Sequence, residues 1–229
     1  MTKKYIFLLW VLTLPLLSQT MTFSGIKGNL VHELSSVIMK KAYTDIGIDA
    51  KFQFLPGERA LKHSNSGLTD GEISRIKRVS KKYPNLLLVP VKINSVDAAV
   101  YSKDTTLSIK KWDDLKPYKV AIVKGTKFIE KGSKHLHPFV VSQFKIAFDM
   151  LLAGRVNIIV VPKLTGDTFI HKKRYKSIIS LGISLKRLDL YHFIHKKNKK
   201  ILPHITQSLQ NMQNSGEIIK LREAFIQSH

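Results

Sequence analysis

Residues 56–76, PGERALKHSNSGLTDGEISRI, decide how the rest of the chain is interpreted. The stretch begins as a short polar helix, and Gly67 can end it because glycine readily adopts the left-handed conformation. A strand is expected from Leu68, with Ile73 on one face and three polar residues on the other: Asp70, Glu72 and Ser74. Burying such groups without partners is costly. The strand therefore either ends at a cleft or is an edge strand with a wet polar face, and we expect the cleft.

The composition is that of a globular protein with a strong positive charge. The 229 residues suffice for one large domain or two small ones, and 44% of them are hydrophobic. Lys and Arg number 38 against 16 Asp and Glu, which gives a formal net charge of +22. This charge is compatible with binding to nucleic acid, anionic membrane surfaces or acidic solutes. The absence of cysteine excludes disulfides, thiolate metal sites and a cysteine nucleophile.

The N-terminus is typical of an export signal. Lys3 and Lys4 precede an apolar run over residues 5–17, and small or polar residues follow where cleavage can occur. We therefore expect a signal peptide over residues 1–20 and a periplasmic mature protein, with an uncleaved anchor as the alternative. The run is shorter than the roughly 20 residues of a membrane-spanning helix, and no other segment of the sequence is long and apolar enough to cross a bilayer.

Strands and helices alternate along the rest of the chain. Strands are expected at residues 21–26, 50–55, 85–91, 96–101, 119–123, 139–141, 156–161 and 188–194. Helices are expected at residues 30–43, 112–115, 128–131, 144–152, 203–212 and 217–225. The composition shifts to a polar join at residues 102–106, where a second alternating unit begins. This pattern favours an α/β fold with parallel sheets.

The loop over residues 123–127 is a candidate anion site. It lies between an expected strand and an expected helix, where backbone N–H groups and the helix dipole attract a carboxylate or phosphate. Gly125 allows close approach of a ligand, and the Thr126 hydroxyl can donate a hydrogen bond. An ordinary turn with a helix cap explains the same residues. The spacing of a phosphate-binding GxxxxGK[ST] loop is absent.

Other chemistries have weaker support in the sequence. Two histidine pairs, His135 with His137 and His192 with His195, lack the carboxylates that would complete a metal site. No motif indicates a Ser/His/Asp hydrolase, and a hydrolase that uses Glu58 or Glu72 is a remote alternative. The basic residues occur in short scattered clusters without interleaved aromatic residues, so nucleic-acid or polyanion binding is the alternative function and a solvated basic surface is preferred.

Several motifs in a fixed order resemble bacterial periplasmic solute-binding proteins of the amino-acid-binding type, extracellular solute-binding protein family three. They are the export signal, PGERAL, NSG and DGE in the stretch above, KYPNL, WDDL before the Gly125 loop, AGRVNIIVVP and the closing NSGEIIKLREAF. The resemblance implies a two-lobe fold of the periplasmic-binding-protein type, in which each lobe is a mostly parallel sheet flanked by helices. Lobe one would comprise residues 21–101 and 197–229, and lobe two residues 102–196.

The resemblance also implies a function. In that family the lobes close over a small solute, and helix N-termini and an arginine hold its anionic group. We expect a monomeric, non-catalytic binding protein without cofactor or metal, whose partners are a solute and a permease of the ABC type or a sensor kinase. The predicted ligand-binding residues are Arg75, Glu72, Glu58, Arg59, Gly125 and Thr126.

The sequence departs from the family at the group that holds an ammonium. Family members that bind α-amino acids usually place an aspartate at the end of the strand after the Gly-Arg-Val turn. Here that strand ends at Pro162, and Asp167 is the nearest acid downstream. We therefore expect an amino-acid-like solute or an organic anion.

Arg75 is the residue on which this interpretation depends. It either pairs with Asp70 or Glu72, or grips a carboxylate with its planar fork. In the second case, Arg75→Ala is expected to weaken ligand binding and to leave the melting temperature of the ligand-free protein nearly unchanged.

Overall fold

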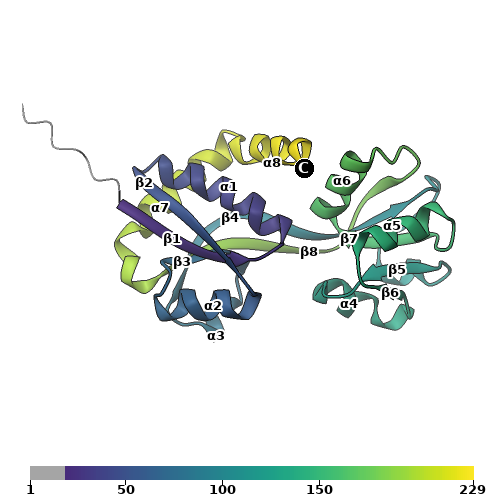
Figure 1. Ribbon diagram of the computed structural model, residues 1–229, viewed down its shortest axis with the longest axis horizontal. Helices are drawn as coiled ribbons and strands as arrows, with labels where there is room; N and C mark the ends of the chain where they lie inside the picture. The colour runs from purple at the N-terminus through teal and green to yellow at the C-terminus, as the bar shows by residue number, and fades with distance from the viewer. Residues whose placement is uncertain (1–18) are drawn as a thin grey trace, which may run out of the picture.

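The computed structural model describes residues 19–229, which form two lobes joined by two long strands (Figure 1). The expected signal peptide lies outside the described residues except for Gln19 and Thr20, which begin the first strand. Among residues 19–229 there is no helix with the length and apolarity needed to span a membrane.

Lobe one contains the beginning and the end of the described chain. In order it comprises β1 (Gln19–Ile26), α1 (Leu30–Thr44), β2 (Ile48–Leu55), α2 (Gly57–Ser66), β3 (Gly71–Ile76) and α3 (Val79–Lys82). The chain returns through η3 (Lys196–Ile201), α7 (Leu202–Asn214) and α8 (Glu217–Ser228). Asn29 caps α1 by accepting the N–H groups of Val31 and His32. Gly67 ends α2 with a φ of 81°, as its sequence position predicted.

Lobe two is formed by the middle of the chain. It contains η1 (Trp112–Leu115), β5 (Val120–Val123), α4 (Lys127–Ser133), η2 (Lys134–Leu136), β6 (Phe139–Val141), α5 (Phe144–Leu152), β7 (Ile158–Pro162) and α6 (Lys163–Lys173). The lobes are joined by β4 (Leu86–Ser102) and β8 (Ile179–His195), an antiparallel pair of strands that runs through both (Figure 1).

The eight strands of the described chain belong to one sheet in the order β2-β1-β3-β8-β4-β7-β5-β6. Pairing is parallel among β1, β2 and β3 in lobe one and among β5, β6 and β7 in lobe two. The antiparallel pairs all involve the two crossing strands. The observed architecture is the α/β, two-lobe fold that the sequence predicted.

Each lobe has its own hydrophobic core. The core of lobe one is built mainly by α1, α7, α8 and strands β1 to β3, together with Val89, Val91 and Ile93 of β4 and Ile194 of β8. Residues of β4 from Ala98 onward pack in the two clusters of lobe two instead. The boundaries expected at 101/102 and 196/197 fall at the ends of the crossing strands. We propose that the lobes meet earlier in each strand, near residues 97 and 188.

Several predicted elements differ from the structure. Leu68 is exposed in the turn after α2, and the strand begins only at Gly71. β3 lies between β1 and β8, so the edge-strand alternative is wrong. Both Glu72 and Ser74 are buried, and the Ser74 hydroxyl finds no hydrogen-bond partner within residues 19–229.

Candidate functional site

The strand directions bring two sets of carboxyl ends toward the junction between the lobes. β4 runs from lobe one to lobe two, and β8 runs back. β3 is antiparallel to β8, so β1, β2 and β3 all run toward lobe two. β7 is antiparallel to β4, so β5, β6 and β7 all run toward lobe one. Figure 1 shows the two sets facing each other, an arrangement in which α/β proteins commonly bind ligands.

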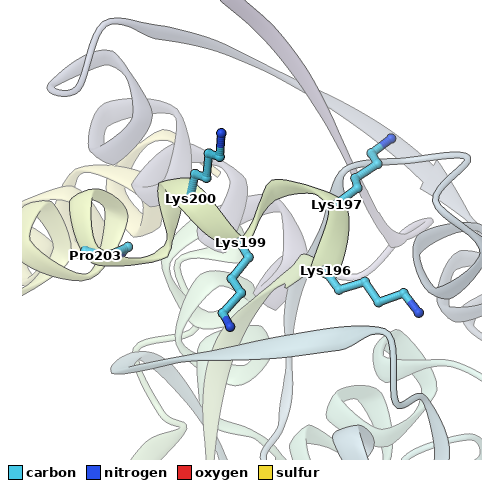
Figure 2. A pocket seen from close by; sticks show the side chains of 5 residues that line it. All are labelled: Lys196, Lys197, Lys199, Lys200 and Pro203. Carbon is cyan, nitrogen blue, oxygen red and sulfur yellow. The ribbon is translucent and has the colours of Figure 1, made fainter.

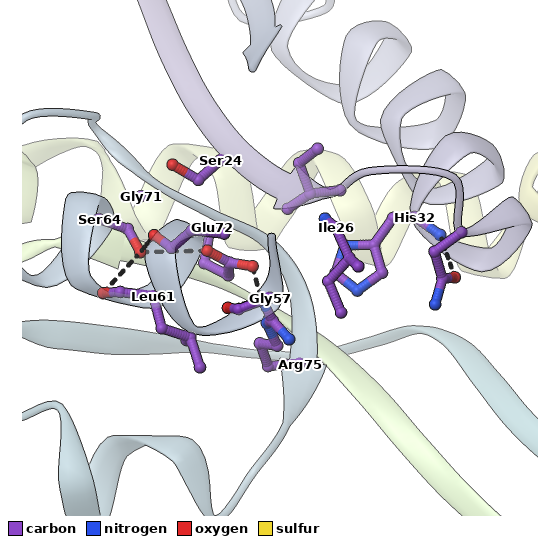
Figure 3. Close-up of polar contacts among 12 residues, drawn as sticks. Ser24, Ile26, His32, Gly57, Leu61, Ser64, Gly71, Glu72 and Arg75 are labelled. Atoms are coloured by element: carbon purple, nitrogen blue, oxygen red, sulfur yellow. Dashed lines mark hydrogen bonds and ion pairs between the residues drawn. The ribbon is translucent and has the colours of Figure 1, made fainter. Parts of the chain in front are cut away.

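Arg75 lies at this edge of lobe one (Figure 3). Its Nε donates to Glu72 Oε1 at 2.7 Å, and its Nη2 donates to the Gly57 carbonyl at 3.0 Å, at the start of α2. The Arg75 side chain is 13% exposed and that of Glu72 is 0% exposed. The pairing that the sequence allowed is therefore present. An arginine has five N–H donors, and those not used in these two bonds have no hydrogen bond to any described residue.

Glu72 is a buried carboxyl held by groups of its own lobe. The Ser64 hydroxyl of α2 donates to Glu72 Oε2 at 3.1 Å, and Arg75 binds the other oxygen. Burial raises the pKa of Glu72 to about 7, although Arg75 and Ser64 favour the charged form. These partners and the protein interior surround Glu72, so the structure shows its contact with Arg75, and a contact with a ligand stays a prediction.

His32 is a residue at this edge that sequence analysis missed. It lies in the first turn of α1, and its Nδ1 accepts the N–H of Ile26, the last residue of β1, at 3.3 Å (Figure 3). Burial, with a smaller effect of the Arg75 charge, lowers the pKa of His32 to about 3. The neutral ring therefore carries its proton on Nε2, which has no hydrogen-bond partner in the described chain. The signal in the sequence was a histidine in the first turn of the helix that begins after Asn29.

Glu58 and Arg59 occupy the exposed first turn of α2. Glu58 accepts a hydrogen bond from the Tyr83 hydroxyl at 2.8 Å and pairs with Lys82 at 3.2 Å. These hydrogen bonds, that of Tyr83 first, lower the pKa of Glu58. Both partners belong to α3 or its C-cap, so the contacts direct the Glu58 carboxylate toward α3. Arg59 lies at an exposed position, and its contact with a ligand stays a prediction.

Gly125 and Thr126 lie at the carboxyl end of β5, at the edge of lobe two, but their polar groups have internal partners. The Gly125 N–H donates to the Glu130 carboxylate, which also pairs with Lys127. The Thr126 hydroxyl donates to the Val123 carbonyl. The hydrogen bond from Gly125 is the main cause that lowers the pKa of Glu130. A bound anion would have to displace this carboxylate, so these two residues remain a prediction.

The second histidine pair, His192 and His195, has structural partners. His192 is fully buried, with Nε2 at 2.9 Å from the Tyr43 hydroxyl and Nδ1 at 3.2 Å from the Ile73 carbonyl. His195 accepts the N–H of Lys197. Within residues 19–229, no three His, Cys, Asp or Glu side chains are grouped as a metal site requires.

Comparison with known proteins identifies the fold. No protein-family model matches the chain. An uncharacterised protein of Shewanella oneidensis is 21% identical over 189 residues, 80% of this chain and 72% of that protein. The L-cystine solute receptor of Neisseria gonorrhoeae, in its unliganded open conformation, aligns with a TM-score of 0.73 at 13% identity, over 92% of this chain and 94% of the receptor. The chain has the fold of a periplasmic solute-binding protein.

The same solute-binding fold occurs in a sensor. A histidine kinase sensor domain with similarity to periplasmic binding proteins aligns with a TM-score of 0.63 at 14% identity, over 91% of this chain and 96% of that domain. The fold expected from the sequence resemblance is thereby confirmed. At these identities the likeness concerns the fold, and the solute has to be argued from the residues of this chain.

Proposed function

We propose that this protein is an exported, non-catalytic binding protein that closes its two lobes over a small solute with an anionic group. The observation that supports this proposal most strongly is the position of Arg75. It lies at the carboxyl edge of lobe one and has N–H groups that no described residue binds. A guanidinium can bind a carboxylate through two charge-assisted hydrogen bonds. Glu72 fixes its orientation from the side, so the arginine is arranged before a solute arrives.

His32 supports the same proposal. As a neutral ring beside Arg75, it offers an Nε2–H donor without adding positive charge. An N–H donor at this edge that has no partner in the described chain can donate to a solute oxygen. We therefore include His32 with Arg75 as a solute-binding residue. The predicted residues of lobe two, Gly125 and Thr126, would act only after lobe closure.

The proposal is tested by a ligand screen followed by one conservative variant. Amino acids, peptides, organic acids and polyamines are screened by thermal shift, where a ligand at about 100 times its Kd raises stability by about 2.7 kcal/mol. Arg75→Lys keeps a cation beside Glu72 but loses the planar fork. We expect it to lose about 1.5 to 3 kcal/mol of binding free energy by calorimetry.

Lys40→Ala, which breaks an exposed ion pair with Asp49 near the amino end of β2, serves as the control and should bind like the wild type. A screen without any thermal shift, or an Arg75→Lys variant of unchanged affinity, contradicts the proposal.

Uptake and sensing are both compatible with this function. A solute receptor and a kinase sensor domain share the fold, and an exported location suits either. Neighbouring genes would separate them, because a permease and ATPase pair indicates transport and a kinase gene indicates sensing. Tight, salt-sensitive binding to DNA would instead favour the nucleic-acid alternative that the net charge allows.

A further inference from the structure

A basic surface lies at the end of lobe one that is remote from lobe two. It is formed by η3, which follows β8 directly. Ile194 of β8 pairs with Gly71, the first residue of β3, so η3 lies beyond the amino end of that strand. Four exposed lysines and a proline line a groove of about 480 Å³ there: Lys196, Lys197, Lys199, Lys200 and Pro203.

Most of this charge is not neutralised within the described chain. Lys197 pairs with Asp70 at 3.0 Å. The other three lysines of η3 make no ion pair with residues 19–229: Lys196, Lys199 and Lys200. The Lys196 N–H donates to the Asn85 carbonyl, and the exposed Lys81 and Lys82 shortly precede Asn85. The basic surface therefore extends from η3 toward α3.

The lysine side chains diverge rather than converge (Figure 2). Lys196 and Lys199 project to one side of η3, and Lys197 and Lys200 project to the other. A site for one small anion needs donors that point at a common centre. Separated ammonium groups on flexible stems match an extended array of negative charges instead.

We propose that this surface docks on the anionic phospholipid headgroups of a membrane. Clusters of four or more lysines or arginines are attracted to such surfaces. β1 begins at the same end of lobe one, and in sequence only Ser18 separates Gln19 from the lysines and apolar run of residues 3–17. The polypeptide that precedes Gln19 therefore enters the domain at the basic end.

This orientation leaves the facing edges of the lobes free, because η3 lies at the opposite end of β3 from Ile76. Nucleic acid fits the surface less well. The η3 sequence KKNKKI has no aromatic side chain to stack on a base. The docking proposal is independent of the solute and would stand if the ligand screen failed.

The test is vesicle binding by the purified protein in the form that cells produce. Vesicles of phosphatidylglycerol and phosphatidylcholine should bind it at low salt and release it at high salt, and pure phosphatidylcholine vesicles should not bind it. The variant Lys196→Glu/Lys199→Glu/Lys200→Glu should lose affinity on the order of 100-fold or more, since each lysine near an anionic surface contributes several-fold.

A matched control changes the same charge at the far end of lobe two: Lys172→Glu/Lys173→Glu/Lys176→Glu, all exposed positions. It should retain most of the vesicle binding, and both variants should melt like the wild type. Equal losses of vesicle affinity in the two variants would show that overall charge, and not the η3 surface, causes the binding, and would overturn the proposal. Absent vesicle binding, preferential binding to duplex DNA, or competition by inorganic phosphate beyond that of an equal ionic strength of chloride would each overturn the proposal.

Discussion

At the level of single residues, the pair formed by Arg75 and Glu72 links the proposed ligand binding to stability. The sequence suggested that Arg75→Ala would leave the ligand-free protein unaffected. The structure indicates otherwise, because the Glu72 carboxyl is 0% exposed and Arg75 is the cation beside it. Removing one partner of a buried ion pair is much more damaging than removing both.

We therefore expect Arg75→Ala to lower the free energy of unfolding by about 3 kcal/mol. The double variant Arg75→Ala/Glu72→Gln should recover much of that loss, since the glutamine side chain is neutral and Ser64 can still hydrogen-bond to it. Urea unfolding of the wild type, both single variants and the double variant gives the coupling. Additive effects would show that the two side chains do not stabilise each other.

His192 makes stability depend on pH. Burial lowers its pKa to about 4, whereas the unfolded chain titrates near 6.5. Between those values the unfolded state binds more protons, so stability falls as the pH falls, by up to about 1.4 kcal/mol per pH unit. His32 acts in the same direction, and Glu72, with its raised pKa, acts in the opposite direction between about pH 7 and 4.5.

A variant separates the contribution of His192 from the others. His192→Gln should be destabilised at pH 7.5, because the bond to Tyr43 is disturbed. The stability difference from wild type should shrink by about 3 kcal/mol on going to pH 4, because only the wild type loses this contribution. His204→Gln, at an exposed position of α7, is the control and should follow the wild-type pH profile. A pH-independent difference for His192→Gln would contradict the assignment.

At the scale of elements, the turn between α2 and β3 requires glycine for two reasons. Gly67 has a φ of 81°, and a Cβ there would lie 3.1 Å from Cε1 of His195. We expect Gly67→Ala to lower the free energy of unfolding by about 1 to 2 kcal/mol from the backbone alone, plus the contact. Gly28→Ala has a similar φ of 66° but no neighbour within 4 Å, so it should lose less. Denaturant unfolding measures the free energy of unfolding of both variants. Equal losses would show that the contact with His195 does not contribute at position 67.

Most elements could be predicted from hydrophobic periodicity and glycine positions, and the misses share a cause. β4 was predicted as two strands and β8 only over residues 188–194, because polar residues such as Asn94 and Arg187 interrupt the apolar pattern where the strands cross between lobes. α6 was not predicted. Its buried positions include Gly166 and Thr168, which carry no helical hydrophobic signal.

The candidate site was only partly predictable for a related reason. The DGE motif pointed to Arg75 and Glu72, but the sequence does not show that Ser64 of α2 reaches Glu72. His32 joins the edge through an N–H of β1. The internal bond from Gly125 to Glu130 likewise depends on how the chain turns into α4. These are tertiary contacts, which periodicity does not encode.

At the scale of the whole molecule, lobe two is an insertion. Cross-strand partners in β4 and β8 include Val96 with Leu188 and Asp97 with Arg187. A chain cut after Asp97 and resumed at Arg187 would meet at adjacent positions, which a two-residue Asn-Gly turn can connect as a hairpin. Such an excision keeps nearly the entire core of lobe one, and Leu164 of α6 is the contributor it removes.

We expect the shortened protein to unfold cooperatively on heating, as followed by circular dichroism, and to have a lower melting temperature because the contacts of Leu164 are lost. It should fail to retain any solute that the intact protein binds between its lobes. A shortened chain without a cooperative transition would mean that lobe one cannot fold alone. A cooperative transition would mean that lobe one is a self-sufficient folding unit and that lobe two is attached to it through one point in the β4–β8 hairpin.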